Sequence, residues 1–581
     1  MPDDGSFQNP FLSNSVATLA DVMERLEQAD LKLAPNRRRD LISSLRCAAR
    51  LMGRSPSEVS IAPRSLRAAL QKIHPAQANI SKKRWANVKS DLKRALTVAG
   101  LTGSDARADI PFSATWQHLS DVCTVNRLRW DLSRFMRYCS GVGIEPEQVA
   151  DETVTLFRTA MEGAALWKDP DQIYRTTIKR WNQAVMSIPA WPQIVLTPPP
   201  SRRETWTIPL TAFPESFQND VAAWKRRMTC SDPFDPSAPP RPLCQKTLDT
   251  RTFQIRMAAS ALVRRNVPID RITSLVTLVS EENFTEILRF LYERHGGPTE
   301  AISGLAQGLI AIARHYVKVD AAILETLSAM AGRIRVKTRG LSQKNRQRLA
   351  AFDDPANVAL HLHLPGHLAR LAKSQSGRKA AVTMQLAAAI EILIMAPIRM
   401  ANLASLRLGH DIKWSRPGNK GLLQITLDPH TVKNRMPVEH ELPSESAKLV
   451  KTYIETYRPN LYANVGDWLF PGKNGQCKIS SGFSEQIKKT IYRHTGLTVN
   501  PHLMRHIGGK LFLDQNPGMY GTLAGVLSHN TLETTMNAYT GTEAKAAGRH
   551  FDSVISSLRA DLPAGRVRLR KKRPVRPRKK K

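Results

Sequence analysis

Six polar residues in the last third of this 581-residue chain could together grip and attack a phosphodiester. They supply two guanidinium groups, one ammonium, two imidazoles and one phenol: Arg399, Lys433, His502, Arg505, His529 and Tyr539. Arginine suits the phosphate because its planar fork can hold two oxygens and stays charged at physiological pH. Tyrosine can attack phosphorus and form a covalent phosphotyrosine link. The residue types therefore predict a site that cuts a phosphodiester.

Four short segments carry these residues in order, over about 140 positions: APIRMANLASLRLGHDI, HTVKNRMPVEHELP, PHLMRHIGGKLF and LSHNTLETTMNAYTG. In order and spacing they resemble the motifs of the tyrosine recombinase family, also called the phage integrases. The resemblance covers the family's catalytic domain, which we expect over residues 350–563. Two positions depart from the family pattern, because Asn402 stands where a carboxylate is common and Ser528 stands where a glycine is usual.

The resemblance implies a role for each of the six residues. Arg399 and Arg505 would clamp the scissile phosphate, and Tyr539 would become joined to the DNA 3′-phosphate. Lys433 would protonate the leaving 5′-oxygen. His502 would act as acid and base, and His529 would donate a hydrogen bond to a non-bridging oxygen. We expect no metal and no nucleotide cofactor, since the phosphotyrosine bond conserves the energy of the broken backbone bond.

Taken singly, each of these residues also has a structural interpretation, as a helix-end arginine, a turn lysine, a core histidine or a packing tyrosine. Three others offer the same chemistry and rank lower only by their position in the motifs: His494, His506 and Arg435. The ordered set favours the catalytic interpretation, because each group is ordinary alone but all six motif positions are filled.

The family resemblance also implies an activity and partners. We expect a site-specific recombinase or integrase that mobilises a genetic element. It would act on double-stranded DNA with specific recombination sites, as a homotetramer or mixed tetramer that passes through a Holliday junction, with companion recombinases or DNA-bending proteins as further partners. Two alternatives stay open: a type IB topoisomerase-like enzyme that relaxes DNA, and a non-catalytic architectural DNA-binding protein.

The charge of the chain favours a polyanionic partner. Lys and Arg outnumber Asp and Glu by 85 to 50, which gives a net charge of +35 and a pI near 10.3. The electrostatic field of such a positively charged protein attracts nucleic acid over a distance set by salt screening. The polar, acidic N-terminus lacks the pattern of an export signal, so we expect a cytoplasmic, nucleoid-associated protein that is not in a membrane. The six cysteines form no C-x-x-C pair, which argues against a zinc site or a disulfide framework.

The elements that must position the six residues are mainly helical. Apolar spacing predicts a multidomain chain with three N-terminal helical bundles, at 1–105, at 110–197 (SAM-like and core-binding-like) and at 212–330 (core-binding). They precede the mixed α+β catalytic domain at 350–563, in which LLQITLDPH and MPVEHELP predict a small antiparallel sheet. The tail 564–581 is rich in Lys and Arg and predicts disorder.

Three further expectations concern the links between these parts. The three bundles are either diverged copies of one DNA-clamping module or unrelated bundles with similar boundary chemistry. Residues 333–364 are polar and basic and predict a linker or extended arm. Beyond the tyrosine, GRHFDSVISSLRADL predicts a helix that the family resemblance would dock on a neighbouring subunit.

Overall fold

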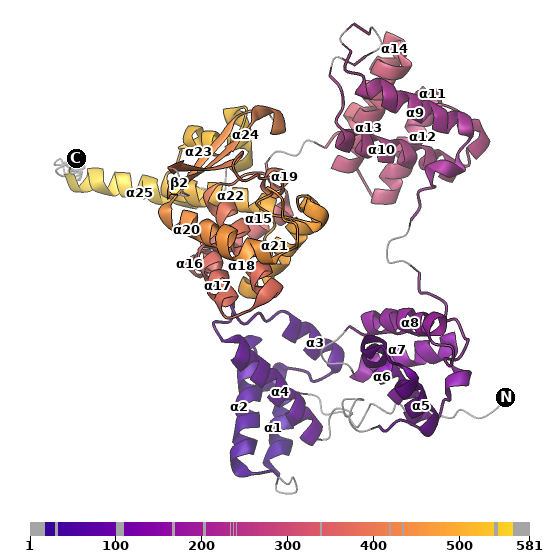
Figure 1. Ribbon diagram of the computed structural model, residues 1–581, viewed down its shortest axis with the longest axis vertical. Helices are drawn as coiled ribbons and strands as arrows, with labels where there is room; N and C mark the ends of the chain where they lie inside the picture. The colour runs from indigo at the N-terminus through magenta and orange to yellow at the C-terminus, as the bar shows by residue number, and fades with distance from the viewer. Residues whose placement is uncertain are drawn as a thin grey trace, which may run out of the picture. The chain divides into compact units, whose positions relative to one another are not determined.

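The computed structural model describes residues 18–28, 33–99, 110–164, 169–200, 205–232, 234–235, 238–239, 241–336, 340–416, 420–432, 435–539 and 544–561 (Figure 1). Lys433 and the predicted disordered tail 564–581 lie outside these ranges. The chain forms two compact units, one from residues 1–199 and 343–581 and the other from residues 200–342. Among the described residues, no helix is long and apolar enough to cross a bilayer.

The first helices of the larger unit are α1 (Leu19–Glu27), α2 (Pro35–Leu51), α3 (Pro63–Gln71) and α4 (Lys82–Val98). Thr18 begins α1 with a capping box, in which its hydroxyl accepts from Asp21 N while the Asp21 carboxylate accepts from Thr18 N. The apolar faces of the helices share one core, in which Leu45 and Leu92 are fully buried. We call this group the first helical group; its polar faces carry most of its Lys and Arg residues.

A second helical group has an aromatic core. It consists of α5 (Ala114–Val122), α6 (Asn126–Val142), α7 (Asp151–Ala164) and α8 (Pro170–Ser187). The rings of Phe135 and Trp181 meet edge to face, with centroids 6.0 Å apart, and Trp116 packs against both. Trp116 and Trp181 also donate their indole N–H to backbone carbonyls, so these large side chains are buried without orphaned donors.

The smaller unit is helical throughout and has its own core. Its helices are α9 (Glu215–Thr229), α10 (Gln245–Arg264), α11 (Leu275–Val279), α12 (Glu281–His295), α13 (Glu300–Ile312) and α14 (Ala321–Arg333). The guanidinium of Arg251 lies over Gly308, where a Cβ atom would stand 2.1 Å from it. The chain is mainly helical, as predicted; the independence of the three helical groups as domains stays a prediction.

The remainder of the larger unit contains the predicted catalytic domain. Its helices are α15 (Gln343–Ala350), α16 (Pro355–Leu362), α17 (Leu364–Lys373), α18 (Gly377–Met395), α19 (Met400–Ala404), α20 (Ser444–Thr452), α21 (Ser480–Thr495), α22 (Pro501–Gln515), α23 (Tyr520–Val526), α24 (Leu532–Tyr539) and α25 (Ala544–Asp561). Helix α18 buries side chains around most of its circumference, which marks it as the central helix of this core.

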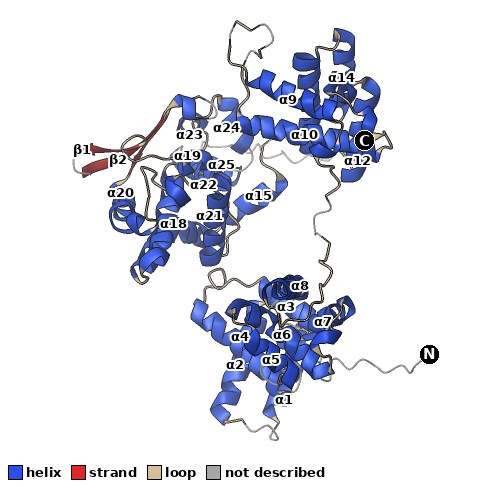
Figure 2. Ribbon diagram, turned by 45° about the vertical axis from the view of Figure 1, so that its right-hand side comes forward, coloured by secondary structure: helices blue, strands red, loops and turns tan. Residues whose placement is uncertain are grey.

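A small antiparallel sheet lies beside these helices (Figure 2). Its strands are β1 (Ile412–Arg416), β2 (Lys420–Leu427) and β3 (Val438–Leu442), in the order β1-β2-β3. The predicted pair corresponds to β2 and β3, with Leu423 opposite Leu442 and Ile425 opposite His440. The sequence prediction missed β1, whose alternation is short and ends in the polar residues Ser415 and Arg416.

The prediction of a linker or arm over residues 333–364 is wrong for much of that segment. Helices α15 and α16 occupy it, because few but well-placed apolar residues reach the core: Leu349 is 1% exposed and Phe352 3% exposed. Asp354 caps α16 by accepting from Ala356 N at 2.9 Å. Within the two helices, all the Lys and Arg residues belong to α15, as Lys344, Arg346 and Arg348.

Candidate active site

Arg399 is placed by the break between α18 and α19. Helix α18 ends at Met395 because Pro397 offers no backbone N–H to continue the helix. Arg399 then takes the N-cap position of α19 with extended backbone angles, φ −71° and ψ 147°. Its side chain is half-buried, and burial lowers the pKa of the guanidinium from its ordinary value. The break thus holds Arg399 at a helix start, where anions are favoured.

His502 and Arg505 lie in the first two turns of α22. The helix begins cleanly because Asn500 Oδ1 accepts from Leu503 N at 2.8 Å and Pro501 occupies the first helical position. A spacing of three residues puts His502 and Arg505 on neighbouring positions of one helix face. His502 is the exposed member of the pair, whereas Arg505 is 7% exposed.

The guanidinium of Arg505 joins two distant backbone segments. Its Nη1 donates to the carbonyl of Pro397, before Arg399, and its Nη2 donates to the carbonyl of Leu527 at 2.7 Å, before His529. Burial, with a smaller effect from the positive charge of Arg399, lowers the pKa of Arg505 to about 10. Arg505 therefore stays charged at neutral pH and ties together the segments that carry two other candidate residues.

His529 follows a turn after α23. Ser528 adopts φ +48°, a left-handed conformation that turns the chain there, and the ring of His529 is held by a 2.8 Å hydrogen bond between Nδ1 and Thr535 Oγ1. Burial and the charges of Arg505 and Arg399 lower the pKa of His529 to about 4. The same three causes lower the pKa of His502. Histidines with lowered pKa values are neutral at pH 7 and can accept a proton or donate a hydrogen bond.

Tyr539 is the last residue of α24 and is fully buried. Its hydroxyl donates to the backbone carbonyl of Arg505 at 3.2 Å. The ring passes so close to α22 that a Cβ atom on Gly509 would stand 2.5 Å from the phenol oxygen. Burial raises the pKa of Tyr539 well above its ordinary value, and the nearby Arg505 lowers it by a smaller amount. The phenol is therefore protonated in this state.

The structure thus brings five of the six predicted residues together, from four separate segments. The sixth, Lys433, lies outside the described residues. Arg435, the nearest described residue after it, has φ +53°. His494 lies elsewhere, with its ring 5.2 Å from that of His367. In the described part of the chain, no group of three or more His, Cys, Asp or Glu side chains could hold a metal ion.

Two further histidines belong to the cluster. The ring of His506 lies 5.6 Å from that of Tyr539 and 5.0 Å from that of His502, and burial with nearby positive charge lowers its pKa to about 4. His440 on β3 is close enough to Arg505 for that charge to contribute to its lowered pKa. The position of His506 four residues after His502 was a usable signal, because such residues neighbour each other on a helix. His440 had no comparable signal.

Comparison with known proteins gives a family match and several structural likenesses. Residues 368–545 match the family model described as the phage integrase family. No curated protein matches the chain. Among solved structures, a XerA recombinase is similar at 15% identity and a TM-score of 0.25, covering 54% of this chain and 92% of that one.

Two other solved structures show likenesses of the same order. A XerH site-specific recombinase in a post-cleavage complex with a palindromic difH substrate is 14% identical, with a TM-score of 0.35, and covers 60% of this chain and 99% of that one. The Tn1549 transposon integrase with a circular intermediate DNA is 13% identical, with a TM-score of 0.34, and covers 58% and 98%.

Proposed function

Because residues 368–545 form a domain of the phage integrase family, we propose that the protein is a site-specific DNA recombinase that cuts and rejoins strands through Tyr539. The observation that carries the proposal is the approach of the Tyr539 phenol to Arg505, whose charge is coupled to that of Arg399. Two arginines and a tyrosine converge there from α19, α22 and α24. This combination suits attack on a phosphodiester.

Arg399 and Arg505 form the phosphate clamp. The charge of Arg399 already lowers the pKa of Arg505, and a phosphate between the two cations relieves that repulsion. The start of α22 adds backbone N–H groups and the positive end of the helix dipole. These groups are fixed before DNA arrives, so they stabilise the charge that grows on the phosphorus oxygens without reorganising.

His502 and His529 complete the phosphate site. As a neutral and exposed imidazole, His502 accepts the tyrosine proton when the phenol attacks. His529 is held through Nδ1, so its Nε2 is the nitrogen free to donate to a phosphate oxygen. By its resemblance to the family motif, Lys433 protonates the leaving 5′-oxygen.

Tyr539 must leave its buried position before it can attack. In the described state its hydroxyl donates to the Arg505 carbonyl, and its pKa is raised by burial. Attack needs the oxygen near the clamp and near a proton acceptor. Cleavage therefore requires a shift of α24 that breaks this hydrogen bond and brings the phenol beside Arg399 and His502.

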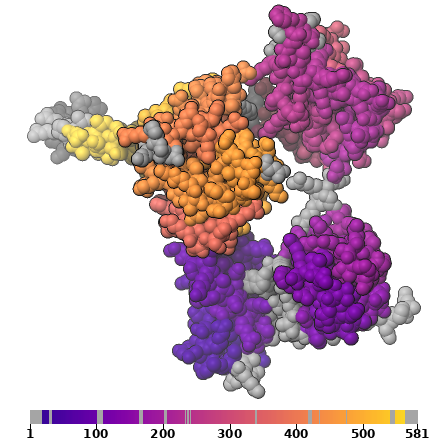
Figure 3. Space-filling model, in the orientation of Figure 1, coloured from indigo at the N-terminus to yellow at the C-terminus, as the bar shows by residue number. Residues whose placement is uncertain are grey.

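The assembly we propose is a tetramer that exchanges strands between two DNA sites through a Holliday junction, in the service of a mobile element. Helix α25 supports an assembly role, because the side chains of residues 547–561 are exposed (Figure 3). Phe551, Ile555 and Leu558 follow the spacing of one helix face, and their exposures are 64%, 37% and 49%. An apolar face of this kind fits a groove on a neighbouring subunit.

A nicked suicide substrate tests the proposed function. Wild-type protein, incubated with nicked DNA made from the ends of its own element, should form a covalent complex that survives denaturation, and Tyr539→Phe should form none. Tyr292→Phe, at a half-exposed tyrosine on α12, is the matched control and should behave as wild type.

Each other outcome selects an alternative. Relaxation of plasmids without a specific site and without exchange between sites would identify a type IB topoisomerase-like enzyme. Absence of any covalent complex, with DNA binding intact, would identify an architectural protein.

A further inference from the structure

Three arginines follow one edge of the first helical group, at Arg46, Arg50 and Arg54. Arg46 and Arg50 are one helical turn apart on α2, and Arg54 continues the series in the turn beyond it. All three are exposed and line an open groove of about 520 Å³, whose other lining residues include Gly53 and one acidic residue, Glu58. Four residues of helix advance about 6 Å, which is close to the separation of successive phosphates along a DNA strand.

These arginines differ from the other cations of α2. Arg37 donates to Asp91 at 2.7 Å, and Arg39 donates to Asn36. Within the described residues, Arg46 and Arg50 form no ion pair, and Arg54 has only an electrostatic interaction with Glu58, whose carboxylate accepts from Ser55 N. Local contacts thus engage arginines at the start of the helix, whereas Arg46 and Arg50 near its end have no ion pair with an acidic group in the described part of the chain.

The groove is the first of three adjoining cavities. Arg54 also lines a cavity of about 310 Å³ together with Lys72 and Gln77. Gln77 lines a third, of about 620 Å³, whose other wall is formed by α16, α17 and the end of α21. Neighbouring cavities share a lining residue, Arg54 for the first two and Gln77 for the last two, so the three follow one another from α2 to α16 and α17. We call this series of cavities the basic track.

The contact between the first helical group and the phage integrase domain is specific. Gln77 Nε2 donates to Asn357 Oδ1 at 2.9 Å and to the Thr495 carbonyl at 2.8 Å. The ring of His74 packs against Tyr492, with centroids 5.6 Å apart. These contacts fix the first helical group on the domain, so that the two parts of the track join in a defined way.

Positive charge also gathers at this junction. Lys82 Nζ lies 3.4 Å from His494 Nδ1, and His367 and Arg370 line the third cavity. Burial is the largest cause of the lowered pKa of His494, which is about 4, and nearby Lys82, His367 and Arg493 lower it further. Asp354 is the acidic residue among the cavity's lining side chains. Because His494 and His367 have lowered pKa values and are neutral at pH 7, the positive charge here comes from Lys82, Arg370 and Arg493, and an anion in the cavity would relieve their repulsion.

We propose that the basic track binds the sugar-phosphate backbone of duplex DNA outside the segment that Tyr539 cuts. The inference rests on the proposed function for the identity of its partner, since DNA is the polyanion that the phage integrase domain would hold. The regular spacing of the arginines, the open groove and the charge at the junction fit one strand of a duplex. Contacts of this kind position the protein and read no bases.

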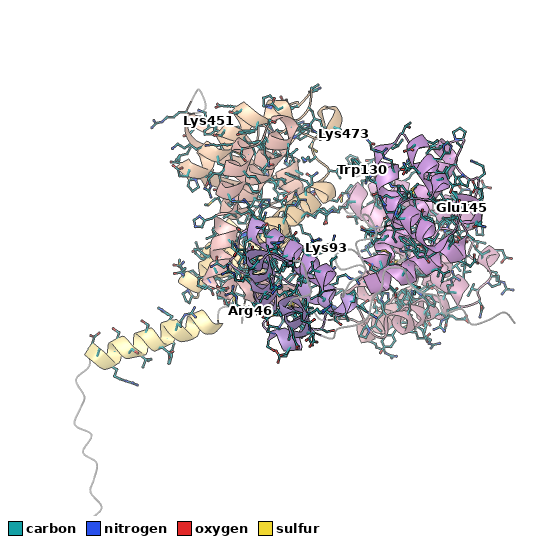
Figure 4. All side chains as sticks on the ribbon, turned by 90° about the horizontal axis from the view of Figure 1, so that it is seen from below. Arg46, Lys93, Trp130, Glu145, Lys451 and Lys473 are labelled. Atoms are coloured by element: carbon teal, nitrogen blue, oxygen red, sulfur yellow. The ribbon has the colours of Figure 1, made fainter. Side chains whose placement is uncertain are left out.

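Two triple variants of the full-length chain test the track. In the track variant, Arg46→Gln, Arg50→Gln and Arg54→Gln remove three charges along the groove; Figure 4 labels Arg46 on α2. In the control variant, Arg64→Gln, Lys83→Gln and Arg84→Gln remove the same charge from exposed positions of the first helical group that line none of the three cavities. Equal thermal unfolding midpoints would show that both variants fold, because all six side chains are exposed.

The readout is the affinity for a duplex that extends well beyond the cleavage site, measured from low to high salt. Each phosphate contact contributes about 0.9 to the slope of log affinity against log salt, so the track variant should reduce that slope by roughly 2 to 3. The control variant should reduce it by less than 1. An equal reduction of the slope in the two variants would overturn the proposal, because it would show that only the net positive charge of the protein matters and not its position.

Two further measurements separate this proposal from the proposed function. Covalent complex formation on a short suicide substrate, too short to reach the track, should be the same in the track variant and the wild type. The wild type could form no covalent complex and yet show a salt slope that the track variant reduces. That result would contradict the recombinase proposal but support DNA binding by the basic track. An equal slope change with single-stranded DNA of the same length would overturn the assignment to duplex.

Discussion

The hydroxyl of Tyr539 donates a hydrogen bond to the backbone carbonyl of Arg505 at 3.2 Å. The proposed nucleophile is thus hydrogen-bonded to a residue that we propose binds the scissile phosphate. The side chain of that same arginine reaches the carbonyls of Pro397 and Leu527. If the backbone of Arg505 moves when DNA binds, the hydrogen bond to the Tyr539 hydroxyl is therefore lengthened or broken. This coupling suggests how a buried phenol is released only when a phosphate occupies the clamp.

A methyl group on Gly509 should push Tyr539 out of its buried site. In Gly509→Ala the new Cβ atom would lie 2.5 Å from the phenol oxygen, a distance that no real contact permits. We expect the unfolding midpoint to fall and the phenol to become accessible, as measured by ionisation of Tyr539 at a lower pH than in the wild type. The pKa should move down towards its ordinary value because the cost of burial is removed.

The neighbouring glycine provides the control for this experiment. Gly508 lies on the same helix, and a Cβ atom there would meet no atom within 4 Å. Gly508→Ala should leave the titration of Tyr539 unchanged and slightly stabilise α22, since alanine favours helix more than glycine does. Equal titration curves for the two variants would contradict the packing argument.

Arg505 and Arg399 should respond differently to replacement by lysine. In Arg505→Lys a single ammonium cannot reproduce the fork that reaches two buried carbonyls, so one is left without a donor, at a cost of about 1–3 kcal/mol of unfolding free energy. Arg399→Lys, at a half-buried helix start, should cost less than about 1 kcal/mol. Urea unfolding measures both.

Cleavage should nevertheless fall in both lysine variants. Loss of one preorganised donor to the reacting phosphate reduces the rate roughly 100-fold to 1,000-fold. The rate of covalent complex formation on the suicide substrate provides the measurement. An Arg399→Lys variant with wild-type cleavage would remove Arg399 from the clamp.

Ordered motifs made much of the candidate site predictable from the sequence. The break at Pro397 and the cap at Asn500 are local signals, and they place Arg399 and Arg505 at helix starts. The buried helix α18 could be recognised because a largely apolar run of that length, interrupted by few polar residues such as Gln385 and Glu391, must be enclosed. Local chemistry of this kind acts over a few residues and is therefore visible in the sequence.

What escaped prediction depends on contacts between distant segments. His440 on β3 comes near Arg505 on α22 only in the folded chain, and neither residue predicts the other in the sequence. The buried state of Tyr539 depends on Gly509, which no helical pattern would single out. Helix α15 was mistaken for a linker because its few apolar residues are outweighed by Lys344, Arg346 and Arg348, and the eight-residue helix α16 is too short to show a helical period.

Acid should destabilise the protein through the site histidines. The pKa values of His506 and His529 are about 4 in the folded chain, below the ordinary value of 6.5. Between pH 6.5 and 4 the unfolded chain therefore binds protons that the folded chain does not, and stability falls as the pH falls through that window. Above pH 6.5 the two histidines contribute no pH dependence, because they are neutral in both states.

His506→Gln tests this linkage. The variant removes one of the depressed groups, so its unfolding free energy should fall less steeply between pH 6.5 and 4 than that of the wild type. The groups that face His506 are the rings of His502 and Tyr539, the charge of Arg505 and the imidazole of His529. Parallel pH curves for wild type and variant would show that burial of His506 does not control the acid sensitivity.

The contact between the first helical group and α21 should depend on Gly496, the residue that ends this helix. This residue has φ +76°, and a Cβ atom there would lie 2.7 Å from the ring of His74 and 2.8 Å from Gln77 Cγ. Gly496→Ala should therefore separate the two surfaces and speed hydrogen exchange in the segment between α3 and α4. Gly409→Ala has the same φ of +76° but meets no atom within 4 Å, so it carries the backbone strain alone. If amide hydrogen exchange in that segment is equally fast in the two variants, backbone strain rather than loss of the contact causes the faster exchange.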